Sequence, residues 1–198
     1  LLVSVSGIGK ETYDVANHLF RRVRAGLGTA TVVANAVFAA VTGSSIASAS
    51  VFTKVAVPEM LRLGYNPRFA VGVVAGSSVL GMLIPPSMLL ILFGILTESS
   101  IGDLFIAGIL PGILLAFAFT VLIAIMARKF PEHVMLGGTE VTDTAPHMTQ
   151  RELYGKLIPI LTLIVIVLGG IWGGIFTATE AGGVGAFGAF GLALLKRS

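Results

Sequence analysis

The sequence predicts an all-α integral membrane protein, because its composition, its long apolar segments and the breaks within those segments all point that way. Hydrophobic residues make up 55% of the 198 residues and charged residues only 12%, whereas soluble domains carry about 25% charged residues. Several segments exceed the roughly 20 apolar residues that a bilayer crossing needs. We therefore expect a multi-pass protein surrounded by a lipid bilayer.

The charges and the missing cysteines exclude several classes of protein. The Lys and Arg residues behind the net charge of +3 lie beside apolar segments, as in cytoplasmic loops, and form no nucleic-acid-binding face. Without cysteine there is no disulfide or thiolate metal site. His18, His133 and His147 lack ligand spacing, so we expect no metal site except one for sodium. The first residue is not Met, and we expect a piece of a longer chain.

Residues 1–24 are expected to hold the end of a preceding span and an amphipathic helix in the membrane interface. Tyr13 and Phe20 fall on its apolar face, and Asp14 and Asn17 fall on its polar face. This pattern suits a helix that lies in the interface plane, although packing against protein produces the same pattern.

Residues 25–63 are predicted to form a re-entrant hairpin, with an apolar limb, a Thr-Gly-Ser-Ser break at 42–45 and a returning limb. Non-helical backbone at membrane depth survives only where protein buries it or where it lines a wet cavity. The returning limb carries Lys54, Glu59 and Arg62, and each charge costs about 2.5–3.5 kcal/mol at the centre of a lipid-facing helix. We therefore expect this limb to be buried in protein, with Glu59 paired to Lys54 or Arg62.

The distribution of basic residues favours the re-entrant topology over a simple crossing. The first arginines are Arg21, Arg22 and Arg24. If residues 25–42 crossed the membrane, Arg62 and Arg68 would lie on the opposite side from them. If the hairpin returns instead, these residues are cytoplasmic, and Arg128 and Lys129 join them after two further crossings. Only the second arrangement follows the positive-inside rule.

Residues 64–130 are predicted to contain a broken transmembrane helix and the span that follows it. Pro85 and Pro86 remove two backbone donors and must open the helix ahead of Ser87. A broken helix that faces a hairpin tip is a carrier arrangement, in which half-helix ends and unwound carbonyls bind ions and anions.

Two sets of site residues follow from these breaks. The ion-binding candidates offer hydroxyl or carbonyl oxygens that suit sodium, and they are Thr42, Gly43, Ser44, Ser45, Pro85, Pro86 and Ser87. The substrate-cavity candidates are small residues nearby, and they are Ala47, Ser48, Gly76, Ser77 and Ser78. Structural roles stay open: Ser44 or Ser45 as a helix N-cap, Ser77 and Ser78 as helix contacts, and the prolines as a packing kink.

Residues 131–156 are predicted to be a polar cytoplasmic connection, and 157–198 to cross the membrane outward and turn back. At the outer turn we expect Thr179 to cap the next helix and Glu180 to offset its dipole, with a proton relay or ion ligand as the alternative role of Glu180. Glycines at every third position predict close helix packing. They are Gly182, Gly185, Gly188 and Gly191.

Ordered motifs along the chain resemble the large membrane subunit (DctM-like permease) of TRAP transporters, the tripartite ATP-independent periplasmic transporters. They are TGSSIA at 42–47, VPEM at 57–60, GYNPR at 64–68, LIPPS at 83–87, SIGDLF at 100–105, AGILPG at 107–112 and GGIFTATEA at 173–181. The resemblance covers nearly the whole chain.

This resemblance implies sodium symport of a small organic anion, such as a C4-dicarboxylate, a sialic acid or another sugar or keto acid, across the bacterial inner (cytoplasmic) membrane. It also implies a periplasmic solute-binding protein, a small membrane subunit, and an elevator-type fold of two inverted repeats, of which 157–198 would begin the second. The alternatives are an ion-coupled anion carrier without a binding protein and a channel-like membrane module. An enzyme is not expected, because no base accompanies the serines, and no cofactor besides the coupling ion is expected.

Overall fold

A computed structural model describes residues 8–20, 25–136, 148–175, 177, 180, 183, 184, 187 and 188. Within these residues the regular structure is helical, apart from an isolated bridge between Tyr65 and Met135. In chain order the helices are α2 (Ile8–Phe20), α3 (Gly26–Thr42), α4 (Ser45–Arg62), α5 (Pro67–Ser78), α6 (Leu80–Leu83), α7 (Met88–Leu96), α8 (Ile101–Lys129), α9 (Pro131–Val134) and α10 (Gln150–Trp172).

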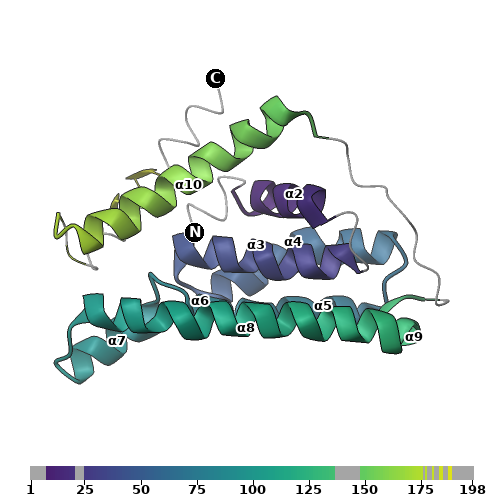
Figure 1. Cartoon of the computed structure of the whole chain (residues 1–198), viewed down its shortest axis with the longest axis horizontal. Coiled ribbons are helices and arrows are strands. Elements are labelled where there is room, and N and C mark those ends of the chain that lie inside the picture. The colour runs from purple at the N-terminus through teal and green to yellow at the C-terminus, as the bar shows by residue number, and fades with distance from the viewer. Residues whose placement is uncertain are drawn as a thin grey trace.

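The helices are stacked in layers around α3 (Figure 1). Helix α8 runs along one side together with α5, α6 and α7, and α3 and α4 form the next layer. Helix α2 lies between that layer and α10. Because α3 packs against α2, α4, α5, α6, α8 and α10, most of its residues are buried.

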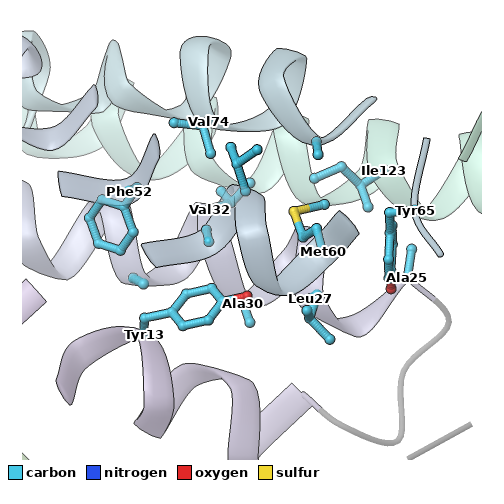
Figure 2. Close-up of a cluster of buried hydrophobic side chains, with 14 of the residues drawn as sticks. Tyr13, Ala25, Leu27, Ala30, Val32, Phe52, Met60, Tyr65, Val74 and Ile123 are labelled. Atoms are coloured by element: carbon cyan, nitrogen blue, oxygen red, sulfur yellow. The ribbon is translucent and has the colours of Figure 1, made fainter. Parts of the chain in front are cut away.

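Helices α3 and α4 form an antiparallel pair that supplies much of the apolar core (Figure 2). The rings of Phe38 and Phe52 meet edge to face with centroids 5.5 Å apart. Farther from the break, Thr31 Oγ1 lies 4.0 Å from Met60 Sδ. The polypeptide therefore turns back on itself where the Thr-Gly-Ser-Ser sequence predicts an interruption.

The segments that follow α4 and α8 are joined by backbone hydrogen bonds. The N–H of Asn66 donates to Val134 O at 2.9 Å, and the N–H of Leu136 donates to Gly64 O at 2.7 Å. These bonds bring the ends of α4 and α8 to one side of the molecule, which we call the basic end. Its basic residues are Arg62, Arg68, Arg128 and Lys129.

The described helices include two that are long and apolar enough to cross a membrane, α8 and residues Arg151–Trp172 of α10. A third span results if Pro67–Leu83 and Met88–Leu96, which are bent by 41° at the proline sequence, count as one. Together with the helical content, this agrees with the predicted all-α membrane protein.

Helix α4 buries one face against this part of the chain and carries its charges on the other face. Lys54 and Pro58 are exposed, and Arg62 lies at the basic end. Glu59 pairs with Arg62 at 2.6 Å rather than with Lys54, and its side chain is 27% exposed. The charges follow one side of the helix, so an apolar side remains to pack against α3 and α5.

Helix α2 has its apolar face covered by protein, which is the packing alternative that its sequence pattern allowed. Tyr13 and Ala16 join the core that α3 and α4 form. On the other side, Asp14 Oδ2 lies 2.9 Å from Lys156 Nζ of α10. Asn17, assigned to the polar face, is also buried.

Helix α10 packs against α3 through Ile160 and Leu163, which contact Val37 and Val41. A Cβ atom added at Gly188 would lie 2.6 Å from Leu163 Cδ2, so this glycine makes the close approach that its spacing predicts. Other sequence predictions concern residues outside the described ranges. These are Arg21, Arg22, Arg24, His147, Thr179, Gly182, Gly185 and Gly191.

Candidate functional site

The glycine break, which consists of Gly43 and Ser44, separates α3 from α4. Gly43 adopts a left-handed φ of 60°, and its N–H donates to Ala39 O at 2.8 Å. Ser44 is extended, and its Oγ accepts a hydrogen bond from the N–H of Ala47 at 3.3 Å. Of the two serines considered from sequence, Ser44 is therefore the N-cap, and Ser45 is the first residue of α4.

The proline break, residues 84–87, separates α6 from α7 and contains a cis peptide bond between Pro85 and Pro86. In a continuous helix the N–H of residue 86 would donate to Met82 O, but proline has no N–H. The Ser87 hydroxyl donates to that carbonyl instead, at 2.6 Å. Ser87 Oγ also accepts from the N–H of Leu90 at 3.4 Å, so the same side chain caps α7.

The two breaks touch through their backbones. The N–H of Met88 donates a hydrogen bond to Gly43 O at 3.1 Å. A Cβ atom added at Gly43 would overlap Pro86 O, and one added at Gly81 would lie 2.8 Å from the N atom of Ser45. Real Cβ atoms do not approach backbone this closely, so both contacts depend on glycine.

The proline break packs against α8 away from either end of that helix. A Cβ atom added at Gly108 would lie 2.7 Å from Leu83 O, and one added at Gly112 would lie 2.9 Å from Ile84 Cγ1. This Gly-xxx-Gly spacing lets backbones approach within a membrane bundle. At 1.5 Å per residue, these glycines lie roughly 10–17 Å from the first residue of α8. The breaks therefore lie beside the apolar body of α8.

A cavity of about 210 Å³ lies beside the two breaks. Its lining residues are Gly43, Ser44, Ser45, Ile46, Gly81, Met82, Met88, Leu89 and Leu92. Three of the predicted ion-binding residues, Gly43, Ser44 and Ser45, are in this lining. The other four are beside it but do not line it, and they are Thr42, Pro85, Pro86 and Ser87.

Helix ends meet at the cavity, although none of its nine lining residues carries a charge and five of them are apolar. The first turns of α4 and α7 both line it, and a helix N-terminus favours an anion. Helix α3 ends at the same place, and the carbonyl groups of its last turn favour a cation. Broken and re-entrant helices in transporters bind anions and sodium with such ends.

Two of the hydroxyl groups predicted to bind an ion already donate their protons locally. Thr42 Oγ1 donates to Phe38 O at 2.9 Å, and Ser87 Oγ donates to Met82 O. Each oxygen keeps lone-pair capacity. Both groups can therefore serve a further partner only as acceptors, which is the role that a cation requires.

The predicted substrate-cavity residues lie at helix contacts, and none of them lines this cavity. A Cβ atom added at Gly76 would lie 3.3 Å from Phe119 Cε1, so Gly76 faces α8. Ser77 and Ser78 are buried and donate to carbonyls of their own helix. Ser48 is buried without a hydrogen-bond partner for its hydroxyl, and Ala47 is half-buried next to the Ser44 cap.

Asn35 is a buried polar residue that the sequence analysis missed. It is 0% exposed in the middle of α3, and its Nδ2 donates to Ser77 Oγ of α5 at 2.7 Å. Its Oδ1 has no hydrogen-bond partner. A buried acceptor left unmet costs about 1–3 kcal/mol. The signal available in the sequence was an amide within an otherwise apolar helix.

At the turn predicted to lie on the outer side, Thr177 forms hydrogen bonds with Glu180. The N–H and Oγ1 of Thr177 donate to Glu180 Oε2 at 2.8 and 2.9 Å, and the N–H of Glu180 donates back to Thr177 Oγ1 at 3.3 Å. These hydrogen bonds, first the backbone one and then the hydroxyl one, lower the pKa of the Glu180 carboxyl. The geometry favours a capping role for Glu180.

Comparison with known proteins places these features in a family. Residues 1–198 match the family described as the tripartite ATP-independent periplasmic transporter, DctM component. The chain is 39% identical over 186 residues to a C4-dicarboxylate TRAP transporter large permease protein DctM of Pseudomonas aeruginosa, covering 93% of this chain and 42% of that protein.

Two further relatives are named for other solutes. A sialic acid TRAP transporter large permease protein SiaM of Vibrio cholerae is 31% identical over 187 residues, covering 92% of this chain and 41% of that protein. An isethionate TRAP transporter permease protein DctMQ of Oleidesulfovibrio alaskensis is 31% identical over 192 residues, covering 94% of this chain and 28% of that protein. These relatives are named as permeases, and the chain spans less than half of their length. Because the family match extends over the whole sequence, the chain belongs to the DctM component family of tripartite ATP-independent periplasmic transporters.

Proposed function

We propose that this chain is part of the membrane subunit of a sodium-coupled secondary transporter, which imports a small organic anion by alternating access. The observation that carries the proposal is the meeting of the glycine and proline breaks. They are joined by the hydrogen bond from Met88 to Gly43 and lie beside a cavity lined by two helix N-termini. Such a site inside a membrane bundle is suited to a solute and its coupling ion.

The proposed topology makes residues 25–63 a re-entrant hairpin and residues 64–130 a broken helix with its following span. Helix α3, with 17 residues, is shorter than the roughly 20 residues of a full crossing. The antiparallel α4 returns the chain to the basic end, where the bonds between 64–66 and 134–136 join it to the end of α8. With the basic end in the cytoplasm, the topology follows the positive-inside rule. Residues 157–198 would then start a second, inverted repeat of an elevator-type fold in the bacterial inner membrane.

In this proposal sodium binds between the two breaks through neutral oxygens. Gly43, Ser44 and Ser45 contribute from the cavity wall, and the C-terminal carbonyls of α3 contribute from behind it. The hydroxyls of Thr42 and Ser87 can act only as acceptors because their protons are already donated. These features support a cation at the break itself and an anionic solute in front of the α4 and α7 N-termini.

The solute is proposed to be a small organic acid, delivered by a periplasmic binding protein. The three relatives described above are named for C4-dicarboxylate, sialic acid and isethionate, all of which are acids. The words "tripartite" and "periplasmic" in the family description support two further components, which we take to be a small membrane subunit and the solute-binding protein.

The test uses cysteine labelling in the full-length subunit, with any cysteines outside this chain removed. Ile46 lines the cavity and is 81% exposed, so Ile46→Cys reports on the site. Leu61→Cys, at the other end of α4 and 41% exposed, is the matched control. Labelling by a small maleimide is measured in sodium and in potassium at equal ionic strength.

We expect sodium to slow labelling at Ile46→Cys and to leave labelling at Leu61→Cys unchanged. Equal labelling of Ile46→Cys in both salts would contradict sodium coupling and favour a channel-like module. Uptake measured with and without the periplasmic binding protein then separates a tripartite transporter from an ion-coupled carrier that needs no such protein.

A further inference from the structure

We propose that Asn35 is a positioning residue that fixes the register of the glycine break against the proline break. Its Nδ2 donates from α3 to Ser77 Oγ of α5 at 2.7 Å, and both side chains are almost fully buried. Ser77 in turn donates its proton to Val73 O at 2.6 Å. The Asn35 amide is thereby connected to the backbone of α5, and we call this pair of side chains the Asn35–Ser77 bracket.

The bracket lies behind both breaks, on the helices that lead into them. Asn35 precedes the end of α3 at Thr42 by seven residues, and Ser77 precedes Gly81 by four. These separations correspond to about 10 Å and about 6 Å along a helix. Gly81 is the residue that touches the backbone at Ser45. A change in how α3 sits against α5 is therefore passed directly to the contact between the breaks.

The apolar contacts between α3 and α5 specify one register less sharply than a hydrogen bond does, because the hydrophobic effect is not directional. A hydrogen bond between two buried groups does so, since a slip by one residue, about 1.5 Å, would leave the buried Asn35 amide without its acceptor. The same slip would draw Gly43 O away from the N–H of Met88. Asn35 also leaves its Oδ1 without a partner, so stability alone does not account for the amide.

This inference rests on the proposed function, because the register matters to transport only if the two breaks share an ion or a solute. Its test therefore includes one measurement that requires neither sodium nor a solute. Spin labels at Ile46→Cys and Leu89→Cys report the separation of the breaks. Ile46 belongs to α4 and Leu89 to α7, both line the cavity, and both are exposed.

The informative variant is Asn35→Leu combined with Ser77→Ala in the full-length subunit, reconstituted with its partner subunits. This change removes both polar groups and replaces the amide by an apolar side chain of similar shape, so no buried group of the bracket is left unmet. Thr120→Val is the control, because Thr120 is a half-buried hydroxyl on α8 that bonds only its own helix, at Ala116 O. Thermal unfolding is measured for each protein.

We expect the double variant to unfold at or above the temperature of the starting protein and yet to show a broadened distribution of label separations. The sodium concentration that half-protects Ile46→Cys should rise about tenfold, since a misplacement near 1 Å can cost up to about 10²-fold. The Thr120→Val protein should match the starting protein in both measurements. If the double variant does not fold, Ser77→Ala alone is expected to give the same broadening.

An unchanged distribution of separations in a folded variant would overturn the inference. Absence of any sodium effect on Ile46→Cys in the otherwise native subunit would instead contradict the proposed function. The label separation still tests the bracket in that case, because its measurement requires no sodium.

Discussion

The glycine break and the proline break meet in space but are built by different means. At the glycine break, the chain leaves α3 through a left-handed residue, Gly43, without losing a backbone donor. At the proline break, two residues without N–H groups stop the helix and bend its path by 41°. Both breaks then start the next helix with a serine N-cap, Ser44 for α4 and Ser87 for α7.

The difference shows how two interruptions can form one site. The glycine break provides room, because the absence of a Cβ atom lets backbone touch backbone at Pro86. The proline break removes the N–H groups that would continue the helix, and the Ser87 hydroxyl satisfies the Met82 carbonyl in their place. Any side chain larger than that of glycine would collide with backbone at these positions. We therefore expect substitutions of the glycines to lower the unfolding free energy more than substitutions of the capping serines do.

The largest effect is expected for Gly43→Ala. The new Cβ would overlap Pro86 O, and overpacking of about 1–3 kcal/mol adds to about 1–2 kcal/mol for a left-handed alanine. We expect a loss of about 3 kcal/mol in unfolding free energy and loss of sodium protection at Ile46→Cys. The control is Gly64→Ala, because Gly64 has a φ of 80° but open space around its Cβ position. That variant should lose only about 1–2 kcal/mol and keep sodium protection. Equal effects of the two variants would show that the contact with Pro86 is unimportant.

The next effect is expected for Gly81→Ala, which tests the other close approach. Its Cβ would lie 2.8 Å from Ser45 N and 2.9 Å from the carbonyl carbon of Ser44. Moving this backbone should cost about 1–3 kcal/mol. Gly72→Ala, on α5 with nothing near its Cβ position, should instead stabilise the helix by about 0.5–1 kcal/mol. Thermal unfolding of the purified subunit checks both signs, and stabilisation by Gly81→Ala would contradict the contact.

A smaller effect is expected for Ser87→Ala, which removes a buried cap. Loss of the cap and of the hydrogen bond to Met82 O, which the same hydroxyl makes, should together cost about 1–2 kcal/mol. Ser100→Ala removes the exposed cap of α8, whose Oγ accepts from the N–H of Asp103, and should cost only about 0.5–1 kcal/mol. Equal losses in unfolding free energy would mean that Ser87 does no more than cap α7.

Both breaks could be predicted from sequence because Gly-Ser-Ser and Pro-Pro-Ser interrupt runs that are otherwise apolar. Their meeting followed from the pattern of arginines, which required the chain to return after the first break. The hydrogen bonds between 64–66 and 134–136 place the ends of α4 and α8 together in agreement with that pattern. Local chemistry and charge were sufficient for these features.

The lining of the cavity could not be predicted in the same way. Successive helix residues are rotated by about 100°, so neighbouring positions at the start of α4 face different surroundings. Ile46 is 81% exposed and lines the cavity, whereas Ser48 is fully buried. The Asn35–Ser77 bracket was missed for the same reason, since the polarity of Asn35 does not reveal which face of α5 will meet it.

The smallest effect concerns a third cap, at the outer turn, which uses a carboxylate instead of a serine. Thr177 lowers the pKa of Glu180 through its N–H and its hydroxyl, so this contact stabilises the turn above the ordinary glutamate pKa and is lost as the pH falls through the lowered value. Thr177→Val removes both hydrogen bonds of the hydroxyl but keeps the backbone bond to the carboxylate. The pKa should therefore rise part of the way, as a carboxyl ¹³C shift titration would measure. An unchanged titration would contradict the hydroxyl contribution.

None of the cavity-lining residues is ionisable, so sodium protection at Ile46→Cys should not change over the acidic range in which Glu180 titrates. A change in sodium protection that follows the Glu180 titration would instead link the outer turn to the two breaks.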